Sequence, residues 1–351
     1  MTPLELLYFL GYAAKKRYAL KNRRRLPHRV ISIGNITLGG TGKTPAVMAL
    51  AQNAASRGFH PCILTRGYKG TARGPCFVSR GEGPLMSAFE AGDEPVLMAE
   101  TLHGIPIVKG KDRREAGMFA IAKLGYQDST VDPHLLFILD DGFQHWALHR
   151  DKDILLIDGT NPSGNGRLFP MGSLREPFSE IKRADLIVIT NLSHSSRAVS
   201  EGEEDHQQAD ERSLTEKIRK CAASIPVYFA RHTPTAFRTA SGNVVPLSQM
   251  KGKNVFAFCG IGNPHSFQHT LRSLIGCQTG FMVFKDHYRY SLADFRTIAG
   301  NAEKCGADWI VTTEKDIMRL KQFSLPDNLL ALRIEFRVDA GFYEAVFDWR
   351  R

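Results

Sequence analysis

The segment with the clearest chemical potential is a glycine-rich stretch near the N-terminus, residues 34–45, which reads GNITLGGTGKTP. A β-rich run over 28–33 precedes it, and a helical pattern over 44–56 follows it. In this setting glycines let successive backbone N–H groups converge on phosphate oxygens, while the helix directs the positive end of its dipole at the same anion. The Lys43 ammonium suits the β- and γ-phosphates of a nucleotide, and the Thr44 hydroxyl suits Mg²⁺. The sequence therefore predicts a binding site for ATP with Mg²⁺.

The stretch departs in one place from the common phosphate-binding pattern G-x-x-x-x-G-K-[ST]. Thr37 stands where that pattern begins with glycine, and Gly39 and Gly40 supply the flexibility instead. The alternative is a glycine-rich turn with a chance Lys-Thr pair, but the strand before it and the helix after it favour phosphate binding. The residues expected to hold the nucleotide are Thr37, Leu38, Gly39, Gly40, Thr41, Gly42, Lys43 and Thr44.

Two acids follow an apolar run in the middle of the chain. Leu135–Leu139 is a predicted buried strand, and Asp140 and Asp141 come directly after it. Kinases and ATPases with a phosphate loop hold Mg²⁺ through an acid in such a position. Either aspartate could contact the metal, directly or through water, and the alternative is a strand-end turn with solvated acids. The expected metal ligands are Thr44, Asp140 and Asp141.

A kinase also needs a group that accepts the proton of the substrate hydroxyl. Asp93 follows a glycine at the start of a predicted helix over 93–102, where an acid taken alone is typical of an N-cap. His287 lies just beyond a predicted strand over 281–284, and loops beyond strand ends are where α/β proteins build their sites. A structural role is the alternative for this isolated histidine.

Strand and helix patterns alternate along the first part of the chain, which is typical of a parallel sheet flanked by helices. Strands are expected over 28–33, 61–65, 105–108, 135–139, 154–157 and 186–190, and helices over 44–56, 93–102 and 113–124. The polar, acidic segment 195–208 is expected to be an exposed loop.

A second, smaller α/β unit is expected to begin near residue 225. Its strands are predicted over 227–231, 254–258, 281–284 and 309–311, and its helices over 264–274, 292–304 and from Glu314 onward. Segments 236–238 and 244–245 are expected to pair as a β-hairpin around Ser241-Gly242-Asn243. The predicted fold class is α/β: a phosphate-loop-containing parallel sheet flanked by helices, with a second smaller α/β domain joined by a β-hairpin linker. The tail 339–351 is expected to hold no more than a short helix.

The composition is that of a globular protein with an anionic partner. The 351 residues are 43% hydrophobic and 23% charged, and the formal net charge is +10. No zinc-finger spacing and no aromatic-basic motif occurs, so we expect no nucleic-acid partner. The six cysteines form no C-x-x-C pair, which favours free and mostly buried thiols in a reducing compartment.

The first 25 residues combine a short apolar helix pattern with a basic cluster. Thr2, Pro3 and Glu5 resemble an N-cap, a first-turn proline and a capping-box acid, and an apolar run over 6–14 follows. This run is shorter than the roughly 20 apolar residues of a spanning helix, and its charges follow it, whereas in a secretory signal they precede it. The helix therefore either lies on an anionic membrane surface or packs on the protein's own core. The basic cluster consists of Lys15, Lys16, Arg17, Lys21, Arg23, Arg24 and Arg25.

Six motifs, in this order, resemble those of the tetraacyldisaccharide 4′-kinase family, the lipid A 4′-kinases of Gram-negative bacteria. They are SIGN through GGTGKTP at 32–45, RGY at 66–68, GDEP at 92–95, DDGFQH at 140–145, LREP at 174–177 and TEKD at 313–316. The segment F-x-D-H-Y at 284–288 is similar as well, and the resemblance covers nearly the whole chain. Residues 171–173 read MGS, where Ala-Gly-Pro is more usual in the family, and this affects only the local loop.

The resemblance implies transfer of the ATP γ-phosphate to the 4′-hydroxyl of a tetraacylated glucosamine disaccharide 1-phosphate, at the cytoplasmic face of the inner membrane. It implies that Asp93 is the general base, that His287 pairs with it or orients it, and that Lys43 acts on MgATP. Because the acyl chains of such a substrate stay in the bilayer, it also favours the membrane-surface role of the N-terminal helix, and hence a peripheral protein. The residues implied to line the substrate or nucleotide cleft are Arg66, Tyr68, Gln144, His145, Arg175 and Glu176.

Three parts of the chain are therefore expected: a membrane-surface helix with its basic segment over 1–25, a phosphate-loop kinase domain over 26–222, and a second α/β domain over 223–351 that closes the cleft. No obligate protein partner is expected. Two rival functions remain open. One is a nucleotide-switch ATPase at the membrane surface, and the other is a membrane adaptor with a decayed loop, against which the intact Lys43, Thr44 and acidic pair argue.

Overall fold

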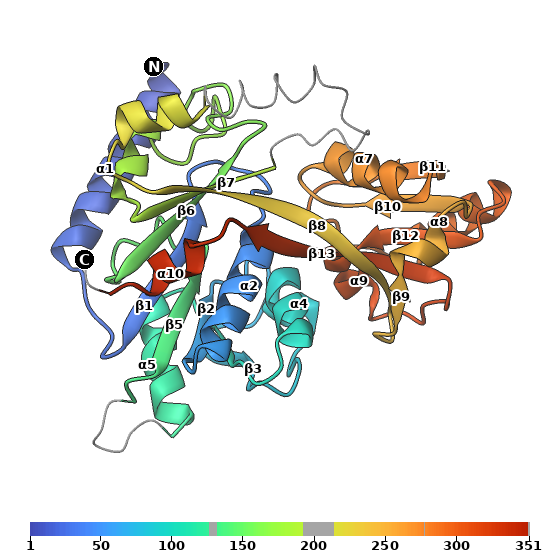
Figure 1. Cartoon of the computed structure of the whole chain (residues 1–351), viewed down its shortest axis with the longest axis horizontal. Helices are drawn as coiled ribbons and strands as arrows, with labels where there is room; N and C mark the ends of the chain where they lie inside the picture. The colour runs from blue at the N-terminus through green and yellow to red at the C-terminus, as the bar shows by residue number, and fades with distance from the viewer. Residues whose placement is uncertain (126–131, 192–213, 277, 350–351) are drawn as a thin grey trace.

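The described strands form one continuous sheet. The computed structural model describes residues 1–125, 132–191, 214–276 and 278–349. Its strands are β1 (Arg29–Asn35), β2 (His60–Thr65), β3 (Cys76–Ser79), β4 (Ile107–Lys109), β5 (Leu135–Asp140), β6 (Lys152–Asp158), β7 (Leu186–Thr190), β8 (Val227–Thr239), β9 (Val244–Pro246), β10 (Val255–Cys259), β11 (Gln278–Val283), β12 (Trp309–Thr313) and β13 (Leu329–Val338). Within the described residues they make a 13-stranded sheet of order β11-β10-β12-β13-β8-β7-β6-β1-β5-β2-β4-β3, with β9 paired to β8. Figure 1 shows the two lobes that this sheet joins.

Helices cover both faces of the sheet in the first lobe. The helices are α1 (Pro3–Lys21), α2 (Lys43–Ser56), α3 (Ala88–Ala91), α4 (Asp93–Thr101), α5 (Arg113–Lys123), α7 (Pro264–Ile275), α8 (Leu292–Lys304), α9 (Glu314–Leu320) and α10 (Phe342–Phe347), with short 3₁₀ helices η1 (Phe178–Arg183) and η2 (Leu247–Met250). Along β1, Ile31 and Ile33 join the core that holds α2 and α4, whereas Val30 joins the core that holds α5. Burial on both faces explains why the parallel strands read as nearly continuous apolar runs.

The second lobe repeats this arrangement on a smaller scale. Along β10, Val255 and Ala257 pack with residues of α7, and Phe256 and Phe258 pack with residues of α8. Parallel pairing of β10 with β11 and with β12 completes the unit. The predicted class, a helix-flanked sheet with a second α/β unit, is confirmed, and α10 is the short helix expected in the tail.

β8 is the main difference from the predicted elements. Separate strands were expected over 227–231 and 236–238, and Pro234, which lacks the N–H that a ladder needs, lies between them. The structure has one strand, and its partner β13 shifts register between Arg333 and Ile334, opposite the proline. The irregularity accommodates the proline, so the prediction of two separate strands is wrong.

The connection between the lobes is an antiparallel pair of long strands. β8 pairs in parallel with β7 over 227–229 and antiparallel with β13 over 230–239. The predicted hairpin with β9 is present at the far end of β8, where Arg238 faces Val244. β3 and β13 were not expected from the sequence. The predicted boundary at residues 222 and 223 stays a prediction, and the predicted loop 195–208 lies outside the described residues.

The cysteines of the described ranges are free thiols, as predicted. Cys62 and Cys259 are buried, and burial raises the pKa of Cys62 well above its ordinary value. Cys221 and Cys305 are exposed, so the expectation of burial is wrong for these two.

Candidate functional site

The phosphate loop, residues 37–44, lies at the carboxyl edge of the parallel strands. β1 ends at Asn35 and α2 begins at Lys43, with Gly42 as its N-cap in the left-handed conformation, φ 78°. A Cβ added to Gly39 or Gly40 would meet no atom within 4 Å, so these glycines face open space. The helix N-terminus behind an accessible glycine backbone is the arrangement that an anion site needs.

The remaining loop residues anchor the loop to its surroundings. Thr37 is buried, whereas Leu38 is exposed and its N–H donates to the Ser173 carbonyl at 2.7 Å. The buried Thr41 accepts a hydrogen bond on its carbonyl from the Thr190 hydroxyl at 3.1 Å. The loop is therefore held at both ends and open at its glycines.

Lys43 lies beside the acidic pair, Asp140 and Asp141. Its Nζ is 3.2 Å from Asn35 Oδ1 and 3.7 Å from Asp141 Oδ1. The strands β1 and β5 are parallel neighbours with Ile33 opposite Asp140, and their adjacent ends bring the loop and the acids together. Burial lowers the pKa of Lys43 even though Asp141 favours its charged form.

The two aspartates sit in different environments. Asp140 is buried and accepts the Thr65 hydroxyl at 2.8 Å, and burial together with the neighbouring Asp141 charge raises its pKa. Asp141 has φ 52°, and although burial opposes it, the charges of Lys43 and Arg175 lower its pKa to about 2. The buried Asp140 carboxylate, the partly exposed Asp141 carboxylate and the hydroxyl of Thr44 are the hard oxygen donors that Mg²⁺ prefers, and a cation would offset the repulsion between the two neighbouring acids. The donor set therefore fits Mg²⁺.

Arg175, Glu176 and Gln144 form a network behind the acidic pair. The Arg175 Nη1 atom donates to both carboxylate oxygens of Asp141, at 3.0 and 2.9 Å. Gln144 Nε2 donates to Glu176 Oε1 at 2.6 Å and to the Asn35 carbonyl at 2.7 Å. Glu176 is fully buried, and burial raises its pKa despite the charge of Arg183. The structure thus brings these predicted residues into contact with one another and with the end of β1.

Arg66, Tyr68 and His145 occupy less connected positions. Tyr68 is exposed, and its ring lies edge-on to His287, with 5.5 Å between ring centroids. Arg66 is also exposed, and its charge lowers the pKa of the buried Arg113, after the larger effect of burial. His145 is half-buried, and burial followed by the Arg113 charge lowers its pKa to about 4. His145 is therefore neutral near pH 7, and its Nε2 atom has no hydrogen-bond partner within the described residues.

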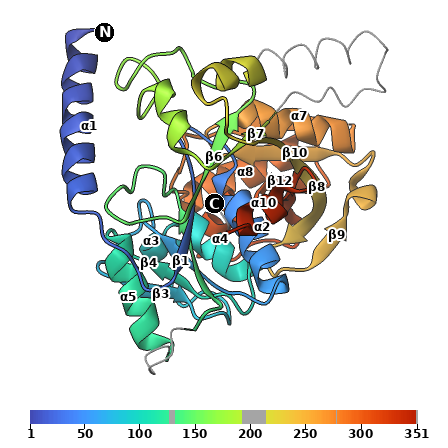
Figure 2. The same cartoon turned by 60° about the vertical axis from the view of Figure 1, so that its left-hand side comes forward.

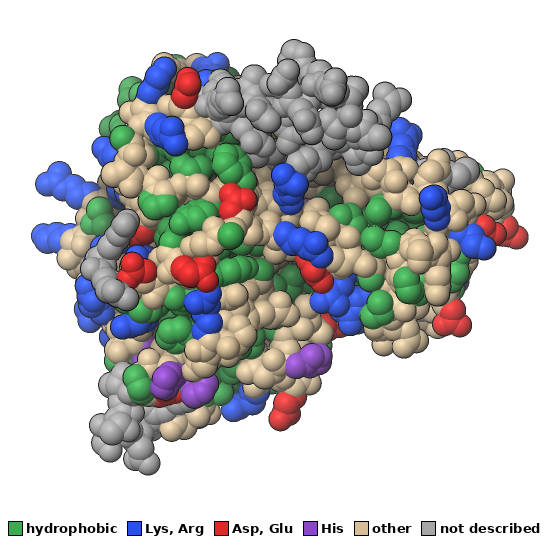
Figure 3. All heavy atoms as spheres, in the orientation of Figure 1, with side chains coloured by type: hydrophobic (Ala, Val, Ile, Leu, Met, Phe, Trp, Pro, Cys, Tyr) green, Lys and Arg blue, Asp and Glu red, His purple; other side chains and the backbone are tan. Residues whose placement is uncertain are grey.

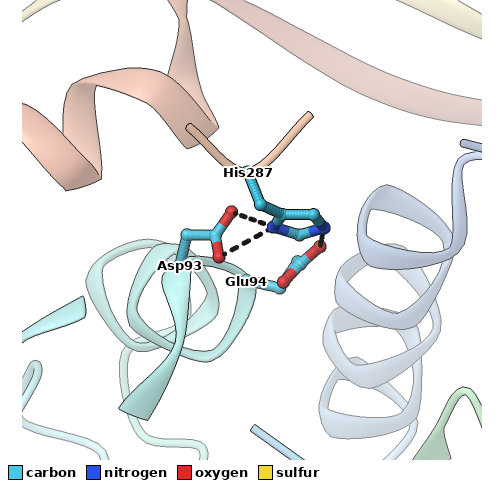
Figure 4. A group of neighbouring side chains, drawn as sticks. All are labelled: Asp93, Glu94 and His287. Atoms are coloured by element: carbon cyan, nitrogen blue, oxygen red, sulfur yellow. Dashed lines mark hydrogen bonds and ion pairs between the residues drawn. The ribbon is translucent and has the colours of Figure 1, made fainter. Parts of the chain in front are cut away.

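A second group of predicted residues meets at the boundary of the lobes (Figure 4). Asp93 is the first residue of α4, and its two carboxylate oxygens each lie 3.2 Å from Nδ1 of His287, in the loop after β11. The His287 Nε2 atom faces Glu94 Oε1 at 3.9 Å. Gly92 is the N-cap of α4, and no side-chain capping bond is made there, so the N-cap alternative for Asp93 is wrong.

Two cations from α9 complete this group. Arg319 donates to Asp93 and, at 2.7 Å, to Asp316, while Lys315 donates to Glu94 at 2.9 Å. Burial alone would raise the pKa of Asp93, but the hydrogen bond from His287 and the Arg319 charge hold it well below its usual range. The hydrogen bond to Asp93 raises the pKa of His287. The charged forms of both partners are therefore favoured.

Asp93, Glu94 and His287 are close enough to share a metal ion, since their ligand atoms lie within 4.8 Å of one another, and no other such group occurs among the described residues. Both carboxylates are already paired with cations, Asp93 with Arg319 and Glu94 with Lys315. A divalent ion would have to displace these cations, so the group is better described as an ion-pair network between the lobes.

The two halves of the site are electrostatically connected. The Lys315 charge contributes to lowering the pKa of Lys43, and the Glu94 charge contributes to raising that of Asp140. A Cβ placed on Gly262, in the loop after β10, would lie 3.6 Å from the Gly40 amide nitrogen. The second lobe therefore approaches the glycines of the phosphate loop itself.

Sequence reasoning gave no role to Arg319, Lys315, Arg113 or Arg183. A helix signal was present for the first two, because Lys315 and Arg319 are four residues apart and share a face of α9. Arg183, in η1, donates to Glu176 at 2.5 Å and stacks 4.1 Å from the Phe143 ring. Its position depends on contacts between distant segments, which no local pattern encodes.

Helix α1 has its leucines outward and packs Tyr8 and Phe9 against the core. Among its 19 residues only Glu5 is buried, and no helix of the described ranges is long and apolar enough to cross a bilayer. Figure 2 shows α1 along one side of the molecule, and in Figure 3 Lys and Arg side chains project at that side. The helix packs Tyr8 and Phe9 on the core and leaves its leucines exposed, so both predicted alternatives stay open. The exposed leucines are Leu4, Leu6, Leu7, Leu10 and Leu20.

Comparison with known proteins gives a consistent result over the whole chain. The model of a family described as tetraacyldisaccharide-1-P 4′-kinase matches residues 1–349. A tetraacyldisaccharide 4′-kinase of Syntrophus aciditrophicus is 38% identical, over 92% of this chain and 84% of its own length. That of Desulfotalea psychrophila is 33% identical, over 99% of this chain and 97% of its own.

A solved structure is similar over nearly the same extent. The crystal structure of LpxK from Aquifex aeolicus, an "apo" form in complex with ATP, superimposes with a TM-score of 0.75 and 31% sequence identity. The match covers 99% of this chain and 98% of that one. The similarity thus includes both lobes and α1.

Proposed function

This chain belongs to the tetraacyldisaccharide-1-P 4′-kinase family, and from that membership we propose that it transfers the γ-phosphate of ATP to the 4′-hydroxyl of a tetraacyldisaccharide 1-phosphate in lipid A biosynthesis. The observation that carries the proposal is the position of Lys43, whose ammonium lies 3.7 Å from Asp141 where a glycine loop opens a helix. Family membership supports the reaction, and this geometry supports the assignment of residues 37–44, Asp140 and Asp141 to the phosphates and the metal.

The phosphate loop, residues 37–44, would hold the triphosphate of ATP. Its glycine amides and the N-terminus of α2 would bind the phosphate oxygens, and Lys43 would neutralise the β- and γ-phosphates. Thr44, Asp140 and Asp141 would hold Mg²⁺, which when bound offsets the charge that develops on the transferred group. Asp141 is the acid whose orientation is fixed, by Arg175 and Lys43, and Asp140 carries the raised pKa.

Asp93 and His287 would handle the proton of the substrate hydroxyl. As the hydroxyl oxygen bonds to the γ-phosphorus, the bond from that phosphorus to the ADP oxygen breaks, and the hydroxyl proton passes to Asp93. The lowered pKa of Asp93 keeps it ionised, so it can accept a hydrogen bond from the hydroxyl throughout, but it makes the carboxylate a weak base. This suits a loose transition state, in which the proton leaves late and positioning dominates catalysis. His287 would orient Asp93 when the second lobe, residues 223–351, closes the cleft.

The other predicted residues divide into two kinds. Tyr68 and Arg66 are exposed near His287 and Arg113, so we assign them to contact with the substrate. Gln144, Arg175 and Glu176 bond to one another and to the acidic pair or the end of β1, so we assign them to the support of the nucleotide site. His145, neutral and half-buried, we place with this second group.

Helix α1 would dock the enzyme on the cytoplasmic face of the inner membrane. Its exposed leucines suit the acyl boundary, and the basic cluster at its C-terminal end, residues 15–25, suits anionic headgroups. Such docking would bring a peripheral enzyme to a substrate whose acyl chains stay in the bilayer.

The test is transfer of label from γ-labelled ATP to a tetraacyldisaccharide 1-phosphate lipid in mixed micelles, with mass spectrometry to locate the new phosphate. We expect labelled lipid that depends on both ATP and Mg²⁺, and none without the acceptor. Release of inorganic phosphate alone, with or without lipid, would instead favour the nucleotide-switch ATPase. A protein that fails to bind MgATP would favour the adaptor.

A further inference from the structure

Helix α1 is hydrogen-bonded to the residues that support the nucleotide site. The Tyr8 hydroxyl donates to the main-chain carbonyl of Arg175 at 2.7 Å, and the Tyr12 hydroxyl donates to Glu176 Oε2 at 3.2 Å. The two tyrosines are four residues apart and share one face of the helix. One face of α1 therefore reaches two consecutive residues of the LREP motif.

Two branches lead from this dipeptide to the phosphate loop. In the first, Arg175 donates to both carboxylate oxygens of Asp141, at 3.0 and 2.9 Å, and Asp141 lies 3.7 Å from Lys43. In the second, the Glu176 carboxylate accepts from Gln144 at 2.6 Å, and the same Gln144 amide donates to the carbonyl of Asn35 at 2.7 Å. Each branch therefore ends on a group that holds or flanks the phosphate loop.

The carboxylate at the branch point is fully buried, which makes its donors important. Glu176 accepts from Tyr12, Gln144 and Arg183, and burial raises its pKa despite the Arg183 charge. Removing a donor from a buried carboxylate leaves it partly unsatisfied, which weakens the rest of its network more than the loss of a surface bond would.

Polar contacts of this kind help to hold α1 on the body of the protein. Glu5 pairs with Arg167 at 2.9 Å, and Lys16 pairs with Glu180 at 2.5 Å, so all these bonds reach residues 167–180. Only Glu5 of the 19 helix residues is buried, and the leucines point outward. Tyr8 and Phe9 also pack against the core, and the Tyr12 ring lies edge-on to Trp146, so the inner face of α1 is held on the body while its outer leucines are exposed. A shift of the helix would therefore move both tyrosine hydroxyls together.

We propose that Tyr8 and Tyr12 are positioning residues for phosphoryl transfer, which couple the seating of α1 to the geometry of Asp141 and Gln144 beside the phosphate loop. This inference rests on the proposed function. With α1 seated, the two hydroxyls fix Arg175 and Glu176 and the acidic pair is held for MgATP. When α1 is displaced, the hydrogen bonds from the Tyr8 and Tyr12 hydroxyls are lost. Arg175 then holds the Asp141 carboxylate less firmly in one orientation.

The experiment compares Tyr8→Phe, Tyr12→Phe and the double variant of the full-length chain with Tyr18→Phe. Tyr18 lies on the same helix but is 73% exposed, so it offers the same chemical change without a buried contact. Mixed micelles supply the lipid, so that access to a bilayer does not limit turnover. We expect kcat/KM for MgATP to fall about five- to tenfold in each single variant, and calorimetric affinity for MgATP to weaken similarly. The Mg²⁺ concentration for half-maximal activity should rise, and binding to anionic vesicles should stay at the wild-type level.

A merely structural role for the tyrosines predicts a different pattern. If the tyrosines are only structural, their removal lowers the fraction of active protein. The kcat then falls while the affinity for MgATP and the Mg²⁺ requirement stay unchanged, and that result would overturn the inference. Equal behaviour of all the Tyr→Phe variants would overturn it as well. If Tyr8→Phe does not fold, Tyr12→Phe combined with Glu176→Gln decides: coupling requires that the second change add little to the first. Wild-type protein that transfers no phosphate to lipid would sink the proposed function, whereas wild-type transfer with unchanged variants would sink this inference alone.

Discussion

Nδ1 of His287 lies 3.2 Å from both carboxylate oxygens of Asp93, and the two residues belong to different lobes. Asp93 opens α4 in the first lobe, and His287 follows β11 in the second. Arg319 and Lys315 of α9 strengthen the same boundary through Asp93 and Glu94. The groups that we assign to the substrate proton are therefore assembled from both lobes, so we expect proton handling to depend on how the lobes meet.

Replacing Asp93 with asparagine tests its assignment as proton acceptor. Asn cannot take the proton, so kcat should fall by about 10²–10⁴-fold. The KM for ATP should change little, because the phosphate loop and Lys43 are untouched. Steady-state kinetics with micellar lipid would measure both quantities.

Asp327→Asn is the matched control for this change, since Asp327 is an exposed acid in the turn before β13. Its kinetics should equal those of the wild type. An Asp93→Asn enzyme with normal kcat and a raised KM for ATP would remove Asp93 from the base role. Melting curves should accompany the kinetics, because Arg319 loses a charged partner in the variant.

The Asp93–His287 pair should stabilise the fold in a limited pH window. Its hydrogen bond to Asp93 raises the pKa of His287 above its ordinary value of 6.5, so its contribution is complete below pH 6.5 and is lost as pH rises through the raised pKa. The lowered pKa of Asp93 keeps its own contribution present down to acidic pH. His287→Gln should therefore lower Tm by on the order of 1–3 °C near pH 6 and by less near pH 9. His103→Gln, at an exposed histidine, should show no such pH-dependent difference, and a constant Tm offset for His287→Gln would contradict the pairing.

Local patterns were sufficient to predict the elements that build the proposed nucleotide half of the site. β1, the glycine loop and α2 are contiguous in sequence, and the predicted face of α2, with Val47 and Leu50, is buried. The spacing of Gly42, Lys43 and Thr44 predicts a phosphate-binding role without knowledge of any distant contact. The acids after β5 could also be placed, because parallel strands that are neighbours end at the same edge.

Features that depend on distant contacts could not be predicted in this way. β8 continues through Pro234 only because β13, about 100 residues later, shifts its register opposite the proline. The contact of Arg319 with Asp93 joins residues 226 positions apart, and its existence depends on how the lobes meet. Likewise, an apolar run such as Leu6–Leu10 predicts a helix but does not say which face the protein covers. The pairing of Asp93 with His287 was expected only from the resemblance to a family.

Two physical effects favour glycine at position 42, and a double variant can separate them. Its φ of 78° is unfavourable for other residues, and an added Cβ would lie 2.1 Å from ring atoms of His232 on β8. Gly42→Ala should therefore weaken MgATP binding by at least about tenfold, as expected of backbone strain worth on the order of 1–3 kcal/mol. Adding His232→Ala removes the collision but not the strained φ, so affinity should recover in part. Gly300→Ala, in α8 with open space around it, should bind MgATP normally. No recovery in the double variant would show that the ring contact is irrelevant.

The outward leucines of α1 predict a membrane affinity that turnover in micelles does not report. Leu7 and Leu10 are 68% and 56% exposed, so replacing both with serine leaves the core intact and removes apolar surface from the outer face. Binding to vesicles rich in phosphatidylglycerol should weaken by about a hundredfold or more, since each buried leucine contributes on the order of 1.5–3 kcal/mol. Sedimentation with vesicles measures this, and salt should weaken the remaining binding because the basic cluster is still present. Leu85→Ser, which removes an equally exposed leucine elsewhere on the first lobe, should change nothing. If the double variant still sediments like the wild type, the leucines are not the membrane contact, and docking would have to depend on the basic cluster alone.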